Sequence, residues 1–400
     1  MVDAKTCLLS VLLTGCGPGN VPYDYPPPPL MDLGLHQAPT YVARDLMPIR
    51  GIALVLAHPR LGQPAIRRAG EVIDVEWISP QLADQPATIS LDDGTWLADG
   101  AGTCDGDGIC HLSVSLPDFA PGLYGICVAV GGQQACSPHA IAIVTTYNDP
   151  ATIVHVSDAH IGYDDAATTF ANVIASIDAI GQTGPTPDFA IFTGDAADSG
   201  LDDQRAVFLQ EIAELNIPVF IVTGNHDYDA TGIDGHLLDV GPELDMQAMY
   251  GGLQLVGVSS GQDLDDGNHD TTISESNGPD SSELTWLATV LTPDAPPTIA
   301  FFHHPIYNGT LATIGPCSRD ALKALVTHDN VRAVLSGHIH ATGVFDADGN
   351  SRGLSLDADT VPSARWPLHY IASRASRAPG GYAILHVGTS RVDYRWIELP

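Results

Sequence analysis

The spacing of apolar residues divides the chain near residue 150. Between residues 46 and 147, apolar side chains alternate with polar ones in short runs such as EVIDVEWI, CHLSVSL and GLYGICVAV, separated by Gly, Pro and Asp. Alternation of this kind is typical of half-buried strands. Short strands at this spacing predict a small all-β sandwich of the immunoglobulin-like kind over residues 46–147.

From residue 150 to residue 400, short apolar runs alternate with amphipathic stretches. The runs TIVHV, DFAIF, VFIV, TIAFF and VRAVL predict strands, and the stretches FANVIASIDAI, RAVFLQEIAEL, SELTWLATVL and RDALKALVTH predict helices. This order indicates an α/β domain. The late segments HYIAS, YAILHVG and VDYRWIEL are expected to close the domain as antiparallel strands.

The N-terminal segment contains a lysine and a short apolar stretch before Leu13-Thr14-Gly15-Cys16. These four residues resemble a bacterial lipobox, in which the cysteine is lipidated and becomes the first mature residue. We therefore expect a lipoprotein signal peptide over residues 1–15 and a lipid anchor at Cys16. The alternative is a truncated secretory signal or a disordered start, because the charged region is short and contains Asp3. Residues 16–45 include four consecutive prolines and are expected to form a linker.

The cysteines predict disulfides in the first domain. Cys127 and Cys136 flank Gly131-Gly132, a natural two-residue hairpin turn, and fall opposite each other at a non-hydrogen-bonded position. Cys104 and Cys110 flank DGDGI and could bridge a second tight turn. That DGDG could instead suggest a calcium loop, but it lacks the spaced ligands and the terminal Glu of an EF-hand. Disulfides favour an oxidising compartment.

The charge of the chain bears on its partners. The formal net charge is -32, with acidic residues scattered through the loops and no basic patch. An acidic surface opposes nucleic acid binding, because no counterions are released from the phosphate backbone. We therefore expect no nucleic-acid partner; solubility or a salty habitat is the simpler explanation of the charge itself.

Polar side chains follow five apolar runs of the second domain. In chain order they are Asp158 and His160 in SDAH, Asp195 in TGDAAD, Asn225 and His226 in TGNHD, His303 in FFHHP, and His338 and His340 in SGHIH. Carboxylate, amide and imidazole groups suit hard or borderline cations. Two such ions about 3.5–4 Å apart can clamp a phosphoryl group and its attacking hydroxide. The five blocks therefore predict a metal site.

These blocks resemble the calcineurin-like metallophosphoesterase superfamily, whose pattern is D-x-H, G-D-x-x-D, G-N-H-[DE], a His after a strand, and G-H-x-H. All five are present in order over roughly residues 150 to 345. The resemblance implies an α/β domain over residues 150–400 that is a four-layer α/β/β/α sandwich. It also implies a phosphoesterase in which a hydroxide held by two metal ions attacks phosphorus.

The resemblance assigns a role to each residue. One metal would be held by Asp158, His160 and His340, the other by Asn225, His303 and His338, and Asp195 would bridge both. His226 would not be a ligand; it would face the phosphoryl group and protonate the leaving oxygen or stabilise the transition state. Asp198 matches the second carboxylate of G-D-x-x-D and would act behind the direct ligands.

Several histidines leave alternatives open. Of the pair His303 and His304, the H-x-P spacing before Pro305 favours His303 as the ligand. His155 is expected in the core. His236 and His269 lie between the third and fourth blocks, where members of the family often line the substrate pocket, so either could contact substrate.

The segment HHPIYN is also similar to purple acid phosphatases. Those enzymes carry a Tyr ligand in the second block and lack the His of the first, whereas this chain reads GDAADS and SDAH. We therefore expect no colour from a tyrosinate bound to iron.

The sequence thus favours an extracytoplasmic, lipid-anchored phosphodiesterase or phosphatase of the bacterial cell envelope, acting on small phosphoesters. The ligand types suit Fe, Mn or Zn about equally. The alternative is a surface binding or adhesion protein, in which the β-sandwich does the work and the phosphoesterase fold is a scaffold. The intact set of blocks counts against that alternative.

Overall fold

The computed structural model describes thirteen stretches of the chain, which are residues 51–82, 85–105, 108–228, 234–241, 244–260, 279, 281–307, 316–328, 330–352, 367–372, 375–376, 380–389 and 392–399. The predicted signal peptide, the anchor at Cys16, the linker and His269 lie outside these stretches. None of the described helices combines the length and apolarity needed to cross a bilayer.

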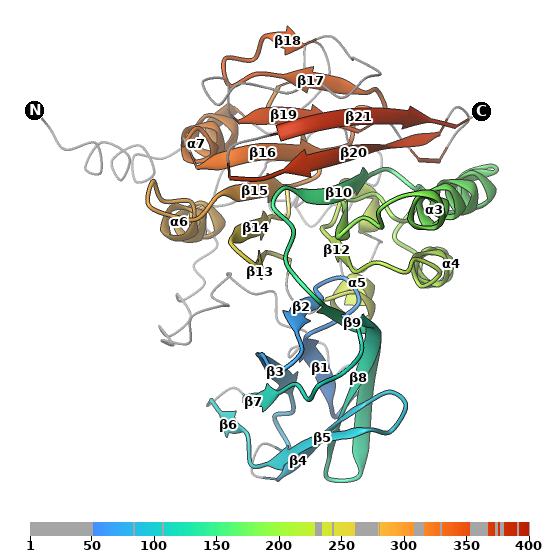
Figure 1. Ribbon diagram of the computed structural model, residues 1–400, viewed down its shortest axis with the longest axis vertical. Helices are drawn as coiled ribbons and strands as arrows, with labels where there is room; N and C mark the ends of the chain where they lie inside the picture. Colours follow the sequence, from blue (N-terminus) through green and yellow to red (C-terminus); the bar gives the residue numbers. More distant parts are fainter. Residues whose placement is uncertain are drawn as a thin grey trace, which may run out of the picture.

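The first domain consists of two packed β-sheets (Figure 1). One sheet has the strand order β1 (Val55–His58), β3 (Val72–Ile78), β7 (Ile109–Ser115) and β6 (Thr103–Cys104). The other has the order β2 (Ala65–Arg68), β9 (Gln133–Val144), β8 (Gly122–Val130), β4 (Ala87–Leu91) and β5 (Trp96–Gly100). Buried side chains from both sheets, among them Trp77 and Val128, form one apolar cluster between them.

The strand order of this sandwich is that of an immunoglobulin domain. Lettered in chain order as A, A′, B, C, C′, D, E, F and G, the strands form the sheets A-B-E-D and A′-G-F-C-C′. At the start of β8, the Tyr124 hydroxyl donates a hydrogen bond of 2.7 Å to the carbonyl of Ala120, which is the tyrosine corner of such domains. The immunoglobulin-like sandwich is therefore present as predicted.

Both predicted disulfides are present in the sandwich. Cys127 of β8 pairs directly with Cys136 of β9, and their Cα atoms are 4.0 Å apart. The turn between them has φ of 56° at Gly131 and 81° at Gly132, the positive values that a two-residue hairpin turn requires. Because non-hydrogen-bonded positions bring Cα atoms closest together, the pairing follows from the register.

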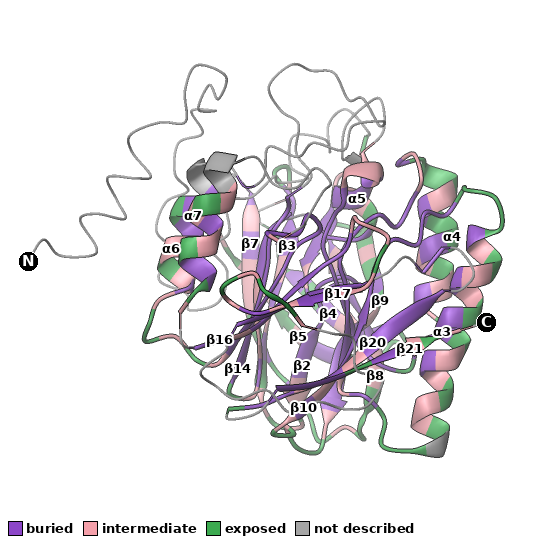
Figure 2. Cartoon of the chain, turned by 90° about the horizontal axis from the view of Figure 1, so that it is seen from above, coloured by how far each residue is buried: buried purple, intermediate pink, exposed green. Residues whose placement is uncertain are grey.

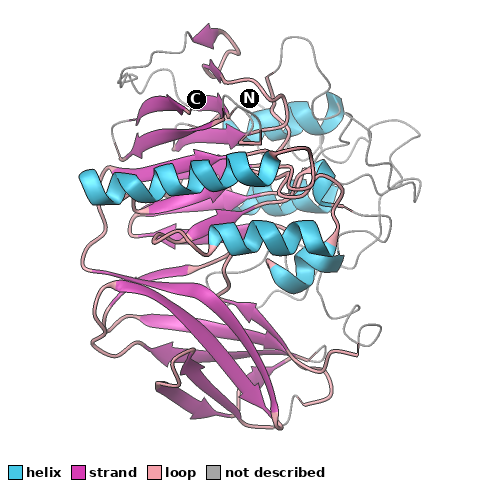
Figure 3. Cartoon of the chain, turned by 90° about the vertical axis from the view of Figure 1, so that its right-hand side faces the viewer, coloured by secondary structure: helices cyan, strands magenta, loops and turns pink. Residues whose placement is uncertain are grey.

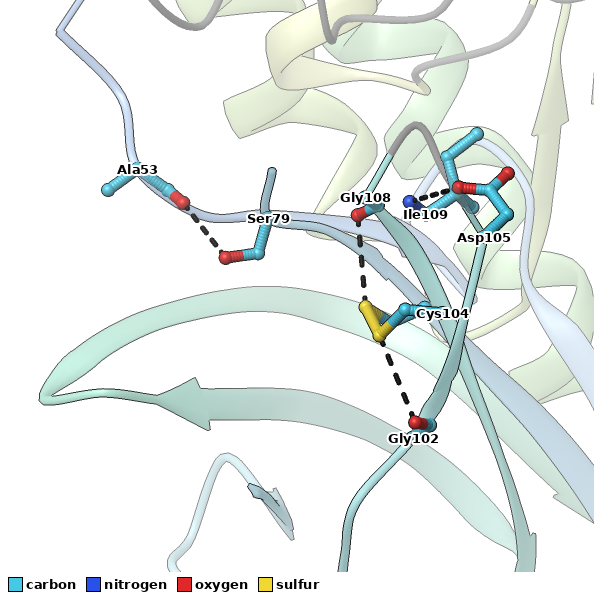
Figure 4. The surroundings of a disulfide bond; sticks show 8 residues. Ala53, Ser79, Gly102, Cys104, Asp105, Gly108 and Ile109 are labelled. Atoms are coloured by element: carbon cyan, nitrogen blue, oxygen red, sulfur yellow. Dashed lines mark hydrogen bonds between the residues drawn. A yellow bond between two sulfur atoms is a disulfide. The ribbon is translucent and has the colours of Figure 1, made fainter. Parts of the chain in front are cut away.

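The second disulfide joins Cys104 of β6 to Cys110 of β7 across the DGDG segment (Figure 4). Asp105 Oδ1 accepts a hydrogen bond of 2.9 Å from the backbone N–H of Ile109. This contact holds together the described ends of the DGDG segment, whose two central residues lie outside the described stretches.

Non-reducing peptide mapping is expected to link Cys127 to Cys136 and Cys104 to Cys110. Because Cys127 and Cys136 are only 9 residues apart, the bridge closes a short loop. Its loss should lower the free energy of unfolding by about 2–3 kcal/mol. Denaturant unfolding of a Cys127→Ser, Cys136→Ser double variant measures this effect. Free thiols at both positions in secreted wild-type material would contradict the oxidising compartment.

The second domain contains two further sheets. One has the order β12 (Val219–Ile221), β11 (Phe189–Phe192), β10 (Ala151–Val156), β20 (Gly381–Val387) and β21 (Val392–Glu398). The other has the order β13 (Met246–Tyr250), β14 (Leu253–Gly257), β15 (Thr298–Phe301), β16 (Val331–Ser336), β19 (Leu368–Ile371), β17 (Gly343–Phe345) and β18 (Ser351–Arg352). Strands β10, β11 and β12 are parallel to one another, as are β14, β15 and β16.

Helices cover the outer faces of both sheets (Figures 2 and 3). Helices α3 (Ala166–Thr183) and α4 (Asp202–Ile212) pack on the five-stranded sheet, and α6 (Ser281–Val290) and α7 (Pro316–Val326) pack on the seven-stranded sheet. Alternate residues of β10 point to opposite faces, so Ile153 joins the core between the sheets while Val154 joins Phe170 of α3. The domain is therefore the predicted four-layer α/β/β/α sandwich.

One prediction about strand direction is partly wrong. Strands β20 and β21 are antiparallel as expected, but β19, which contains the segment HYI, runs parallel to β16 and antiparallel to β17. The physical reason is that apolar alternation marks a segment as a strand without specifying its direction.

The segment that joins the two domains, around Tyr147 and Asn148, contacts both of them. The Tyr147 hydroxyl donates a hydrogen bond of 2.6 Å to Glu71 of the sandwich. The Tyr147 ring packs edge-on against Tyr250 of β13 at 5.2 Å, and the Tyr250 hydroxyl accepts the backbone N–H of Asn148. The short helix α5 (Asp234–Asp239) lies at the junction of the two domains (Figure 1).

Candidate metal centre

The polar blocks lie at the carboxyl ends of parallel strands, where neighbouring strands bring them together. SDAH follows β10, TGDAAD follows β11, TGNHD follows β12 and contains a short 3-10 helix (Asn225–Asp227), FFHHP follows β15 and SGHIH follows β16. Five residues of these blocks have left-handed backbone angles, with φ of 57° at Asp158, 43° at His160, 58° at Asp195, 71° at His338 and 54° at His340. Such angles in residues other than glycine are uncommon and concentrate at functional sites.

The first predicted ligand set forms one cluster. Asp158, His160, Asp195 and His340 each offer a ligand atom, and these atoms lie within 4.8 Å of one another. His160 Nε2 is 2.9 Å from His340 Nε2 and 3.4 Å from Asp195 Oδ2. Both carboxylate oxygens of Asp158 accept the backbone N–H of His338 at 3.1 Å. This hydrogen bond ties the first block to the fifth.

The second cluster contains His303 and His338 together with His304. His303 is fully buried, and its Nδ1–H donates a hydrogen bond of 2.6 Å to the carbonyl of Thr193. This fixes the tautomer in which Nε2 carries the free lone pair. That Nε2 lies 3.1 Å from Asp195 Oδ2. Of the two adjacent histidines, the geometry thus favours His303 as the partner of the shared carboxylate.

Buried polar atoms without hydrogen-bond partners show that this donor set fits cations. The atoms are Asn225 Oδ1 and His304 Nε2, and also Asp195 Oδ2 and His303 Nε2, which face each other at 3.1 Å without a well-aligned hydrogen bond. A buried polar atom without a partner is costly. A cation in contact with these oxygen and nitrogen atoms removes that cost, and the mixture of carboxylate, amide and imidazole suits Fe, Mn or Zn.

Electrostatics keep the two carboxylates ionised. Burial opposes the charge of Asp158, but the neighbouring His160 and His340 outweigh it and hold the pKa of Asp158 well below its usual value. Burial also opposes the charge of Asp195, and the neighbouring His303 outweighs it, so the pKa of Asp195 is lowered too. Both carboxylates are therefore in the form that binds cations.

The histidines of the site differ in charge. Although burial lowers the pKa of His160, the neighbouring carboxylates of Asp158 and Asp198 raise it to about 10. Burial likewise opposes the charge of His303, but Asp195 raises its pKa to about 9. Burial and the charge of His303 lower the pKa of His338 to about 4. In the metal-free protein, His160 and His303 therefore carry protons that a cation must displace.

His226 is held beside the metal ligands by two contacts. Its backbone N–H donates a hydrogen bond of 2.8 Å to Asp195 Oδ1, and its Nδ1–H donates one of 2.7 Å to the carbonyl of Asp198. A carbonyl can only accept, so the second bond leaves Nε2 as the nitrogen available to a substrate. The ring packs edge-on against His160 at 4.6 Å. Asp198 Oδ1 also lies 3.4 Å from His160 Nδ1, which places Asp198 behind both histidines.

Asp227 is a residue of the site that sequence reasoning missed. Its carboxylate accepts backbone N–H groups of Asp195, Ala196, Ala197 and Gly224 at 3.0, 2.8, 3.1 and 2.8 Å. Burial and the charge of Asp195 raise its pKa. Asp227 therefore joins the second block to the third. Its position directly after Asn225 and His226 was the one available signal.

The remaining histidines lie near the site without belonging to the predicted ligand set. His304 Nδ1 is 3.1 Å from the Ser260 hydroxyl. His155 is buried in β10 and contacts the Thr193 hydroxyl at 3.0 Å, so it is a core residue as expected. His236 is 4% exposed within α5, so it is buried rather than lining an open loop.

Comparison with known proteins finds similarity to phosphoesterases over the part of the chain that contains these clusters. The family model described as calcineurin-like phosphoesterase matches residues 151–342. A cAMP/cGMP dual specificity phosphodiesterase of Mycobacterium tuberculosis is 30% identical over 207 residues, which are 47% of this chain and 61% of that protein. A probable cyclic nucleotide phosphodiesterase of Rhodococcus erythropolis is 31% identical over 219 residues, which are 47% of this chain and 64% of that protein.

A third relative is a probable glycerophosphodiester phosphodiesterase of Arcobacter nitrofigilis. It is 34% identical over 83 residues, which are 19% of this chain and 29% of that protein. The chain thus covers 61% and 64% of the length of the first two relatives, which is less than two thirds of either.

Proposed function

We propose that the chain is a calcineurin-like phosphoesterase, because the model of that family matches residues 151–342, and that it is a metal-dependent phosphodiesterase with two ions in one site. The observation that carries this proposal is the position of Asp195. Its Oδ2 atom lies 3.4 Å from His160 Nε2 of the first cluster and 3.1 Å from His303 Nε2 of the second. One carboxylate oxygen shared by two ligand clusters is what a dinuclear site requires.

The chain offers a ligand set for each ion. Asp158, His160 and His340 would hold one, Asn225, His303 and His338 would hold the other, and Asp195 would serve both. Bound ions of this kind polarise a phosphoryl oxygen and lower the pKa of a water molecule. Hydrogen bonds from His303 Nδ1–H to the Thr193 carbonyl and from the His338 backbone N–H to Asp158 orient these ligands in advance.

His226 would act on the leaving group. Because its Nδ1–H is held by the carbonyl of Asp198, a proton can pass to the substrate only from Nε2. An alkoxide leaving group needs such a proton, whereas a nitrophenolate leaves as a stable anion. Asp198 would keep the ring in this orientation through its backbone and would contact His160 through its carboxylate.

The proposed substrates are small phosphodiesters. Two of the relatives carry names of cyclic nucleotide phosphodiesterases and a third that of a glycerophosphodiester phosphodiesterase, and all three names denote diester hydrolysis. The net charge of -32 gives long nucleic acids no basic surface to bind. A monoesterase activity is the alternative that a substrate screen addresses.

A metal-reconstitution assay tests the proposed function. The purified protein is freed of metal with a chelator, loaded with Mn, Zn or Fe, and assayed on cyclic AMP, glycerophosphodiesters and a phosphomonoester. We expect activity to disappear on chelation and to return with about two ions per chain. A fully loaded protein that hydrolyses none of these esters would overturn the proposal.

We also propose that the protein works outside the cytoplasm, attached through Cys16. The two disulfides of the sandwich support an oxidising compartment. The Leu13-Thr14-Gly15-Cys16 sequence supports a lipid anchor.

Cys16→Ser should release the protein from membrane fractions, because serine cannot carry a thioether-linked diacylglycerol. Fractionation of bacteria that express wild type and variant, followed by immunoblotting, measures the change. A Cys7→Ser variant is the matched control and should stay in the membrane fraction. Wild-type protein that is already soluble and begins at Met1 would show that the lipobox interpretation is wrong.

A further inference from the structure

The sandwich contacts the second domain through the loop between β1 and β2. We propose that this loop, residues 59–63, is a positioning part of the phosphoesterase site, with Arg60 holding α5 and thereby the segment that orients His226. The inference rests on the proposed function for its effect on turnover. It gives the sandwich a role inside the enzyme rather than as a separate binding module.

Arg60 caps the carboxyl end of α5 from the sandwich. A single nitrogen, Nη2, donates hydrogen bonds of 2.7 Å to the carbonyl of Leu238 and 3.1 Å to that of Asp239. Carbonyls at the end of a helix lack partners within the helix, so these bonds fix the position of α5. The contact joins residues 178 and 179 positions apart in the chain.

The environment of Arg60 argues against a role in stability alone. The residue is 7% exposed, and its Nε and Nη1 atoms are buried without hydrogen-bond partners. Burial lowers its pKa to about 10. Burying a guanidinium with two unused nitrogens is costly. Its position is therefore better explained by what it holds in place than by a net gain in stability.

The loop itself approaches the second domain closely at Gly62. Its carbonyl accepts the backbone N–H of Ile221 in β12 at 2.9 Å, and a Cβ atom at Gly62 would lie 2.5 Å from Val240 Cγ1. Val240 directly follows α5. The loop thus contacts both the edge strand that leads to Asn225 and the helix beside it.

Helix α5 is connected to the site through Arg205 of α4. The Nε atom of Arg205 donates a hydrogen bond of 2.9 Å to Asp239, and Nη1 donates one of 3.3 Å to the carbonyl of Gly200. The guanidinium also lies against the backbone of α5, because a Cβ atom at Gly235 would be 2.0 Å from its Nη2. Arg205 therefore links the end of α5 to the segment that follows Asp198.

That segment reaches the reacting groups directly. The carbonyl of Asp198 accepts Nδ1–H of His226, and its carboxylate contacts His160. One small cavity is lined by Asp227, Ala196 and Ala197 on the side of the site and by Arg205 and His236 on the side of α5. A shift of α5 is therefore transmitted to the loop that orients His226.

The test uses Arg60→Gln in the full-length, metal-loaded protein. Displacing a positioned group by a fraction of an ångström is expected to slow turnover of cyclic AMP, whose ribose leaving group needs a proton, roughly tenfold. Turnover of bis-para-nitrophenyl phosphate should change by less than about threefold, because nitrophenolate needs no proton. Metal content should be unchanged.

Two variants serve as references. Arg67→Gln removes the same charge from the same domain, but Arg67 donates its hydrogen bonds to the carbonyls of Ile66 and Val72 within the sandwich, so this variant should match wild type. Arg60→Lys should restore most of the cyclic AMP activity, because one ammonium can replace the single nitrogen that bonds both carbonyls. A purely structural defect would instead lower both activities together.

Asp239→Asn covers the case in which Arg60→Gln does not fold. Asp239 lies at the surface, with 49% of its side chain exposed, and its carboxylate pairs with Arg205. This variant should also lose more activity on cyclic AMP than on the nitrophenyl ester. Equal losses on both substrates, or none, in these variants would overturn the inference while leaving the proposed function intact.

Hydrogen–deuterium exchange tests the connection without relying on activity. In Arg60→Gln, peptides covering residues 196–210 and 234–241 should exchange about tenfold faster than in wild type and in Arg67→Gln. Faster exchange confined to the sandwich would contradict the inference. If wild type hydrolyses no phosphoester, the proposed function fails, and this measurement still decides whether Arg60 holds the site.

Discussion

Asp195→Asn is expected to abolish phosphoester hydrolysis and to reduce the metal content to one ion or none. The shared Oδ2 atom faces ligand nitrogens of both clusters, at 3.4 Å for His160 and 3.1 Å for His303. The asparagine amide keeps the shape of the carboxylate but removes the negative charge that offsets two cations. Because both metal ions depend on this ligand, turnover should fall by about 10³-fold or more, as it does when one member of a cooperating catalytic group is removed. Metal analysis and a diester assay on the same sample measure both effects.

Asp178→Asn is the matched control for this prediction. Asp178 bonds to Gln182 and Asn216 at the surface, on the helical side of the five-stranded sheet. The variant has the same change of charge and should keep both metal content and activity. If Asp195→Asn retained two ions and a near-normal rate, the assignment of the bridging ligand would be wrong.

The second large effect is expected for His226→Ala. This variant should keep two ions, because His226 belongs to neither of the two clusters that meet at Asp195, and it contacts Asp195 through its backbone, which alanine retains. His226 does form a third group with His160 and Asp198, so the metal content of the variant tests its role directly. Loss of the Nε2 proton donor should slow turnover of cyclic AMP by roughly 10²–10⁴-fold. The loss should be smaller for bis-para-nitrophenyl phosphate. Steady-state kinetics on both substrates and metal analysis measure the difference.

His328→Ala, outside the site, should match wild type in the same assays. Loss of metal in His226→Ala would show that His226 is a ligand. An equal loss of rate on both substrates would show that it does not act on the leaving group. Either result would require a different role for this residue.

Most of the architecture could be predicted because local pattern and tertiary position agree. In β10, alternation of Ile153 and Val154 assigns one face to the core between the sheets and one to α3. The carboxyl ends of parallel strands meet at one edge, so blocks far apart in the chain converge there. The hairpin glycines likewise fix the register that pairs Cys127 with Cys136.

What could not be predicted depends on contacts that only the folded chain creates. Asp227 occupies the last position of the G-N-H-[DE] pattern, but its role consists of bonds to backbone N–H groups, which that pattern does not reveal. Arg60 lies between two strands of the sandwich, yet its partners are backbone carbonyls of α5. The parallel direction of β19 and the burial of His236 likewise depend on neighbours far away in sequence.

Five site residues have a left-handed backbone, and this affects which substitutions would accumulate in related chains during evolution. They are Asp158, His160, Asp195, His338 and His340. Each position costs about 1–2 kcal/mol relative to an ordinary conformation, and glycine relieves that cost. Without selection for catalysis, these positions would be free to drift toward glycine or asparagine. Glycine here would then mark a descendant that keeps the fold only as a scaffold, while retained aspartate and histidine mark a chain still under selection for its chemistry.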